Sequence, residues 1–184
     1  MKTKYRVAAS VAALLFPLVS ATAAHANTYQ YNVRIVNLQT GNCLDAGTSQ
    51  VHTQACNGGD YQRWNVTSYD SDVNNYYGRV QIQSVHDKRC LRMYHSGGGI
   101  AVVVGSCDSR AVEDQWHITW VGNHAQNPNN SWQFFNVGGT GANPWAATCL
   151  DSGQSRLAFQ YNPNQGLAWC PDALNRYQIW AMTS

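Results

Sequence analysis

One short pattern occurs three times along the chain. A Cys-Leu pair is followed 13 to 21 residues later by a second cysteine and then, 8 to 10 residues further on, by a tryptophan. The copies run from Cys43-Leu44 to Cys56 and Trp64, from Cys90-Leu91 to Cys107 and Trp116, and from Cys149-Leu150 to Cys170 and Trp180. Because these copies account for all six cysteines, the chain is predicted to repeat one structural unit three times, each with its own disulfide.

The first 26 residues have the pattern of a secretory signal peptide. Three basic residues near the start precede a mostly apolar run over residues 7–19, and a small-x-small cleavage site ends at Ala26. The apolar run is shorter than the roughly 20 residues of a membrane-spanning helix, and no later stretch approaches that length. We therefore expect a signal peptide over 1–26, a single mature domain over 27–184 and a secreted protein with no membrane span.

The charge of the mature chain is nearly balanced. The expected signal peptide takes three of the 12 Lys and Arg residues and none of the 10 Asp and Glu residues, which leaves 9 minus 10, or about −1. Lys88 is the only lysine after residue 26, and the arginines are scattered. Since nucleic-acid binding needs a concentrated basic surface, a nucleic-acid partner is not expected.

The cysteines are expected to form disulfides, because an exported chain with an even cysteine count favours them. The repeat symmetry selects the pairs Cys43–Cys56, Cys90–Cys107 and Cys149–Cys170. A metal site is not expected, because no two cysteines have the C-x-x-C spacing and the histidines of the mature chain are isolated. No cofactor is predicted either.

Short strands are predicted upstream of each Cys-Leu pair. Segments 34–38, 81–85 and 133–137 are rich in β-branched or aromatic residues, and clusters of Gly, Asn and Asp separate them. Charged residues make up only 12% of the chain, and Glu113 is its single glutamate, which argues against exposed helices. We predict an all-β fold with helix confined to single turns.

The three units, at about 31–70, 78–121 and 131–182, are too small to bury separate cores. We expect them to close around a pseudo-threefold axis and share one core. Trp64, Trp116 and Trp180 stand at equivalent positions, and burial of their large rings would fill that shared centre.

Two of the repeats carry a more specific signature. Cys-Leu-Asp at 43–45 and 149–151, together with Gln-x-Trp at 62–64 and 178–180, resembles the ricin B-type lectin family. The resemblance covers roughly residues 31–182 and implies a β-trefoil fold that binds a glycan or polysaccharide. The middle repeat departs from it, because Arg92 stands in place of the Asp and Asp114 in place of the Gln.

The resemblance also implies which residues would bind sugar. In the family the Asp anchors each pocket, joined by a residue four before the second cysteine, an aromatic ring two before it, and an Asn-Gln pair before the Trp. The candidate carbohydrate-binding residues are accordingly Asp45, His52, Gln54, Tyr61 and Gln62 in the first repeat, and Asp151, Trp169, Tyr177 and Gln178 in the third. The expected ring is missing, because Gln54 and Ala168 occupy its place; Trp169 or Tyr61 could substitute.

Structural roles for the same residues remain open. Each Asp follows a buried leucine and is expected to point outward toward a ligand, yet Asp also commonly caps turns. An amide such as that of Gln62 or Gln178 often binds backbone groups instead of a ligand. In the second repeat we expect no family-type pocket, with Arg92 paired to Asp114 or Glu113.

Two functions from different classes follow. The first is a secreted lectin-like protein with up to two sugar pockets, in the first and third repeats. The alternative is a β-trefoil interaction module, such as a toxin subunit or inhibitor, that has lost sugar binding and takes a partner protein. An enzyme is not expected, because the chain contains no G-x-S-x-G, H-E-x-x-H or phosphate-loop motif.

Overall fold

The computed structural model describes residues 28–47, 50–69, 77–96, 99–122, 130–136, 148–153, 159–161 and 175–184. The expected signal peptide and the residues Trp169 and Cys170 lie outside these ranges. Within them, twelve strands and three single-turn 3-10 helices, labelled η, follow one another in the same order three times.

Each unit contains four strands with a 3-10 turn before the fourth. The first unit has β1 (Thr28–Asn37), β2 (Cys43–Asp45), β3 (His52–Gln54), η1 (Asp60–Gln62) and β4 (Trp64–Ser68). The second has β5 (Tyr77–Ser84), β6 (Cys90–Ser96), β7 (Gly99–Gly105), η2 (Val112–Asp114) and β8 (Trp116–Trp120). The third has β9 (Ser131–Asn136), β10 (Thr148–Asp151), β11 (Phe159–Tyr161), η4 (Arg176–Gln178) and β12 (Trp180–Thr183).

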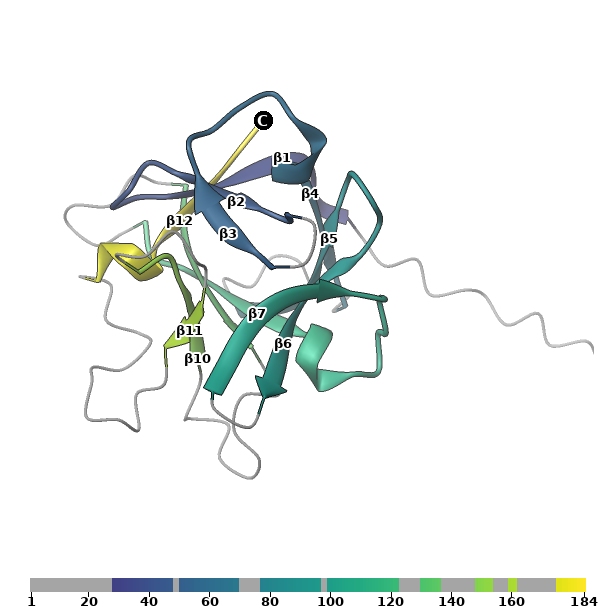
Figure 1. The fold of residues 1–184 in the computed structure, drawn as a ribbon. Coiled ribbons are helices and arrows are strands. Elements are labelled where there is room, and N and C mark those ends of the chain that lie inside the picture. The colour runs from purple at the N-terminus through teal and green to yellow at the C-terminus, as the bar shows by residue number, and fades with distance from the viewer. Residues whose placement is uncertain are drawn as a thin grey trace, which may run out of the picture.

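The first and fourth strands of the units close into a barrel. β1 pairs with β4, β4 with β5, β5 with β8, β8 with β9, β9 with β12, and β12 with β1, all antiparallel. The second and third strands form the hairpins β2–β3, β6–β7 and β10–β11, which lie around a common axis (Figure 1). This is the predicted all-β trefoil with pseudo-threefold symmetry, and its helix is confined to single turns within the described residues.

The three equivalent tryptophans lie in the core, as predicted, and all are fully buried. Each indole Nε1–H donates to the backbone carbonyl of the leucine in its own Cys-Leu pair. The distances are 3.0 Å from Trp64 to Leu44, 2.9 Å from Trp116 to Leu91 and 3.0 Å from Trp180 to Leu150. A buried indole needs such a partner, and the repeated bond ties each fourth strand to the second strand of its unit.

Two of the predicted disulfides are present, Cys43–Cys56 and Cys90–Cys107. Each joins the first residue of a hairpin to the segment just after that hairpin's second strand. Cys149 is also disulfide-bonded, and its expected partner Cys170 lies outside the described residues.

Side-chain amides at strand ends join neighbouring units. Asn37, the last residue of β1, donates from Nδ2 to the carbonyl of Tyr177 in η4 at 2.7 Å. Asn136, the last residue of β9, donates to the carbonyl of Glu113 in η2 at 2.7 Å. Both asparagines are buried, so these bonds fix each barrel strand against the turn of an adjacent unit.

The predicted strand segments fall within the barrel, but their bounds differ. β1, β5 and β9 begin before the predicted starts at 34, 81 and 133. β1 and β5 end one residue earlier than predicted, and residue 137, the predicted end of the third segment, lies outside the described residues. Their early residues pair with strands distant in sequence; Tyr77, for example, lies opposite Thr119 of β8. Local composition did not show this pairing, because it joins segments that are distant in sequence.

Candidate functional site

The β2–β3 hairpin brings three predicted site residues together. In its register Asp45 lies opposite His52, and Cys43 lies opposite Gln54. Because side chains alternate along a strand, Asp45, His52 and Gln54 share one face of the hairpin, with Gln54 diagonal to Asp45.

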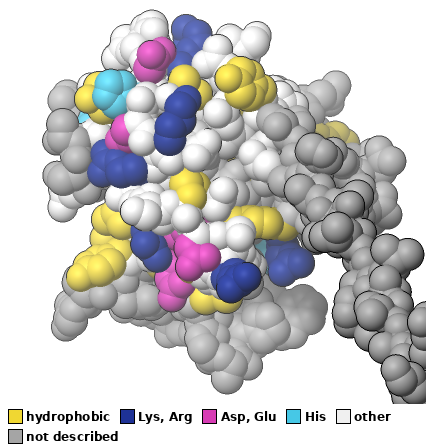
Figure 2. All heavy atoms as spheres, turned by 90° about the vertical axis from the view of Figure 1, so that its right-hand side faces the viewer, with side chains coloured by type: hydrophobic (Ala, Val, Ile, Leu, Met, Phe, Trp, Pro, Cys, Tyr) yellow, Lys and Arg dark blue, Asp and Glu magenta, His cyan; other side chains and the backbone are white. Residues whose placement is uncertain are grey.

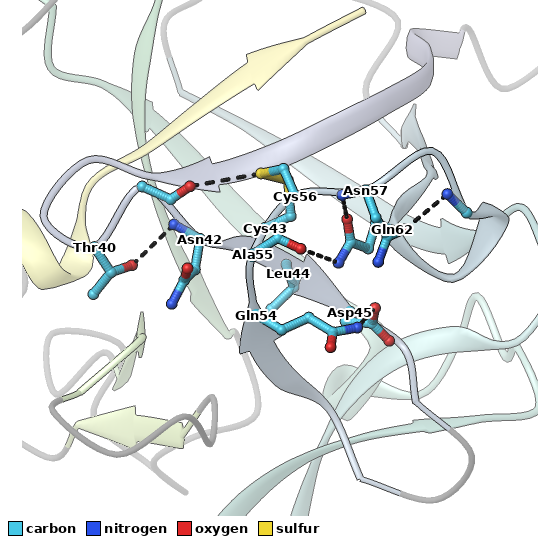
Figure 3. Close-up of a disulfide and its surroundings, with 12 residues drawn as sticks. Thr40, Asn42, Cys43, Leu44, Asp45, Gln54, Ala55, Cys56, Asn57 and Gln62 are labelled. Atoms are coloured by element: carbon cyan, nitrogen blue, oxygen red, sulfur yellow. Dashed lines mark hydrogen bonds between the residues drawn. A yellow bond between two sulfur atoms is a disulfide. The ribbon is translucent and has the colours of Figure 1, made fainter.

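The Asp45 carboxyl group is buried rather than directed outward, so that expectation was wrong. Only 3% of the residue is exposed. Its Oδ1 accepts from the backbone N–H of Gly47 at 2.9 Å. Its Oδ2 accepts from Nε2 of Gln54 at 2.5 Å, and Figure 3 shows the Gln54 side chain reaching this carboxyl group. The ring Nε2 of His52 lies 4.0 Å from Oδ1. The carboxylate is held by its own hairpin and by the turn that follows it, in which Gly47 adopts a positive φ of 54°.

Gln62 is not part of this cluster. It is fully buried, its Oε1 accepts from the N–H of Asn57 at 2.7 Å, and its Nε2 donates to the carbonyl of Ala55 at 3.2 Å. Figure 3 shows this amide bound to the backbone around Cys56, while Gln54 reaches Asp45. Both ends of the Gln62 amide are therefore used to hold the loop that follows β3.

Tyr61 contributes to packing in a way that the sequence did not indicate. Its side chain packs against the core, and its ring stacks on that of His86 with centroids 3.7 Å apart. Its carbonyl accepts from the N–H of Ala46 at 2.9 Å. The exposed ring at this place is that of His86, which sequence analysis missed because it comes from the turn after β5 in the next unit.

The third unit repeats the Asp-x-Gly turn. Asp151 is 4% exposed; its Oδ1 accepts from the N–H of Gly153 at 2.6 Å, and its Oδ2 accepts from Nε2 of Gln178 at 3.1 Å. Burial raises the pKa of the Asp151 carboxyl group, although these two hydrogen bonds oppose the shift. As in the first unit, the carboxyl group expected to point outward is buried.

Gln178 is held differently from Gln62. Its Oε1 is buried and has no hydrogen-bond partner among the described residues. In the first unit that oxygen accepts from Asn57, the residue after the second cysteine, but the equivalent sequence position in the third unit is Pro171, which has no N–H. The amide of Gln178 instead donates to Asp151.

Tyr177 occupies the position equivalent to Tyr61. It is partly buried, and its carbonyl accepts from the N–H of Ser152 at 3.1 Å, as that of Tyr61 does from Ala46. Trp169 and Ala168 lie outside the described residues.

The second unit replaces the aspartate site with an ion pair. Nε of Arg92 lies 3.0 Å from Oδ1 of the fully buried Asp114, which confirms one of the two expected pairings. Arg92 crosses Gly105, where a Cβ atom would lie 2.7 Å from its Cδ. Burial raises the pKa of Asp114, opposed by the N–H of Asp108 and the Arg92 charge. The residues Arg92, Gly105 and Asp114 therefore fit one another and fill the place of a pocket.

The described part of the chain offers little for other kinds of site. None of its helices is long and apolar enough to cross a membrane. Within the same residues no three His, Cys, Asp or Glu side chains gather in a way that could hold a metal ion. On the face shown in Figure 2, acidic and basic side chains are interspersed.

Comparisons with known proteins identify the fold and the family. The family model for the ricin-type beta-trefoil lectin domain matches residues 31–131. A ricin B-like lectin of Macrolepiota procera, solved in complex with lactose, superposes with a TM-score of 0.57 and 16% identity over 85% of this chain and 96% of that one.

Two further solved structures share the fold. The designed three-fold symmetric protein ThreeFoil has a TM-score of 0.58 and 15% identity over 83% of this chain and 97% of its own. A mosquitocidal holotoxin has a TM-score of 0.58 and 18% identity, and this chain covers 17% of it while 84% of this chain is matched. No curated protein matches the sequence. On the family match over more than half of its length, the chain belongs to the ricin-type beta-trefoil lectin domain family.

Proposed function

We propose that this protein is a secreted carbohydrate-binding protein with up to two sites, one at Asp45 and one at Asp151. The observation that carries the proposal is the pair of equivalent carboxylates, each oriented by a glycine N–H and a glutamine amide. A carboxylate offers about four acceptor positions, of which these bonds use two at each site, so its chemistry suits it to accept sugar hydroxyls. The second unit, with Arg92 in place of the aspartate, does not contribute a site of this kind.

We propose that these two sites bind sugar and do not catalyse a reaction. The chain carries no recognised catalytic motif, and its relationship is to a lectin family. Two modest sites on one rigid body would gain avidity on a polyvalent glycan. Secretion is proposed from the signal-peptide pattern, and cleavage near Ala26 can be checked by the mass of the exported protein.

A glycan array tests the proposal directly, with lactose conjugates included because the Macrolepiota procera lectin was solved with lactose. Wild-type protein should be retained on at least one glycan, and the double variant Asp45→Asn, Asp151→Asn should lose retention while remaining folded. Asp60→Asn, a change at an exposed aspartate, is the matched control and should bind as the wild type does. Undiminished retention of the double variant would exclude these two sites.

The second candidate is an interaction module without sugar binding. Both carboxylates are buried and already bonded within the protein, and the similarity to part of a mosquitocidal holotoxin favours a role beside a partner protein. Wild-type protein that binds no glycan on the array, yet forms a complex that the double aspartate variant leaves intact, would support this function over the first.

A further inference from the structure

We infer that Gln54 is an internal cap on the first carbohydrate site. Its side-chain amide occupies the oxygen of Asp45 that a sugar hydroxyl would use. This inference rests on the proposed function, and it separates the two sites: the first is closed by the protein's own side chain and opens only when Gln54 turns away.

The register of β2 and β3 brings Gln54 next to Asp45. Gln54 is the last residue of β3, diagonal to Asp45 on the same face, and its Nε2 donates to Oδ2 at 2.5 Å. The diagonal distance across an antiparallel pair is within reach of a long side chain. Gln54 also stands two residues before Cys56, where the family resemblance expects an aromatic ring that stacks on the sugar.

The bond is one that a ligand must compete with. Hydrogen bonds to an ionised acceptor are stronger than those between neutral groups, and with the Gln54 amide in place Asp45 is only 3% exposed, so a ligand reaches this oxygen only after the amide has left. A sugar therefore binds only the fraction of molecules in which Gln54 has turned out, and its apparent affinity falls by that fraction. Gln54 itself is partly exposed, which leaves it a direction in which to turn.

The third unit cannot form the same bond from the equivalent sequence position. Ala168 stands at the sequence position equivalent to Gln54 and carries no amide. There the second oxygen of Asp151 is bound by Gln178 from the turn before β12, and Oε1 of that glutamine is buried without a partner among the described residues. A ligand donor would satisfy this oxygen, so binding at the third unit gains a contact where binding at the first unit must break one.

The test isolates the first site with Asp151→Asn and then removes the cap. Binding is measured by biolayer interferometry to albumin conjugates that carry lactose, N-acetylglucosamine or mannose. In the Asp151→Asn background, Gln54→Ala should raise the apparent affinity by about tenfold or more, the scale of a hydrogen bond to a charged group. Gln39→Ala, a change at an exposed glutamine in a turn, is the matched control and should leave affinity unchanged. Unchanged or weaker binding of the Gln54→Ala protein would overturn the inference while leaving the proposed function in place.

A second measurement does not depend on any ligand. By NMR, the side-chain amide protons of Gln54 should be shifted downfield and exchange slowly compared with those of Gln39, and Asp45→Asn should remove the difference. Gln54 amide signals that match those of Gln39 in the wild type would overturn the cap. If no conjugate binds any variant, the proposed function fails and this NMR comparison alone decides whether the cap exists.

Discussion

At the scale of single residues, one equivalent position is used in two different ways. The residue two before the tryptophan is Gln62, Asp114 or Gln178. The first two accept from the N–H of the residue after the second cysteine, at 2.7 Å in both cases. The third turns to Asp151, because the corresponding residue of its unit is Pro171. One residue type outside the motif thus decides whether a motif glutamine braces a loop or orients a carboxylate.

The buried tryptophans support a prediction at this scale. Trp64→Phe removes the Nε1–H bond to Leu44 and leaves a gap in the core, so the free energy of unfolding should fall by about 1–3 kcal/mol. Trp116→Phe and Trp180→Phe should cost similar amounts, because the bond recurs. Urea unfolding measures the loss. Trp132→Phe is the control, because the indole bond of Trp132 to Asn130 is exposed. If the three core variants lose no more stability than Trp132→Phe does, the argument is contradicted.

The sequence predicted what spacing and charge record, and missed what depends on register and on contacts between units. The buried tryptophans, the described disulfides and the Arg92–Asp114 pair follow from spacing, symmetry and charge. The Gln54 bond to Asp45 depends on hairpin register and on which way an amide turns, neither of which a linear pattern records. His86 belongs to the next unit, and the pairing of β4 with β5, which puts Trp64 opposite Ser84, brings its ring to that of Tyr61.

At the scale of elements, the three hairpins differ because their turns differ. β2 ends at Asp45 and β10 ends at Asp151, where an Asp-x-Gly sequence turns the chain with a glycine at positive φ. In the second unit Arg92 replaces the aspartate, and β6 continues to Ser96 opposite β7. The second unit therefore lacks both the carboxylate and the glycine of the Asp-x-Gly turn, Tyr94 standing in place of that glycine, and its hairpin is longer; the sequence had indicated only the loss of the carboxylate.

The β6–β7 hairpin gives a prediction with a definite sign. Alanine in place of a glycine in an extended strand ordinarily stabilises by about 0.4–1 kcal/mol. At Gly105 the new Cβ would meet Cδ of Arg92 at 2.7 Å, displace it from Asp114 and leave a buried carboxylate weakly paired. Gly105→Ala should therefore destabilise by about 1–2 kcal/mol, whereas Gly78→Ala, with open space around it, should not.

Thermal unfolding of both variants checks this sign difference. In an Arg92→Ala background, Gly105→Ala should lower the free energy of unfolding much less than it does in the wild type, because the side chain that it would displace is absent. A Gly105→Ala protein as stable as Gly78→Ala would show that Arg92 moves aside freely and that the ion pair does not depend on the missing Cβ.

At the scale of the whole molecule, the barrel closes between the first unit and the last. β1 pairs with β12, and Asn37 binds the turn that precedes β12. The sequence predicted three units around one axis, since no unit is large enough to hold a core alone. It could not predict the asparagine bonds between units, because they join residues 140 positions apart for Asn37 and 23 apart for Asn136.

The burial of Asp151 in the folded chain predicts how the free energy of unfolding depends on pH. Burial raises the pKa of Asp151 above 3.8, its value in an unfolded chain, so over that interval the folded state binds a proton that the unfolded state has lost. The contribution of this group to the free energy of unfolding therefore falls as pH rises above about 3.8 and levels off beyond the folded pKa. Asp151→Asn does not titrate, and its amide donor can satisfy Oε1 of Gln178 if that side chain turns over. Urea unfolding should show that the variant gains stability relative to the wild type as pH rises from 3.5 to 7. A difference that stays constant or shrinks would mean that burial does not raise the pKa of the Asp151 carboxyl group.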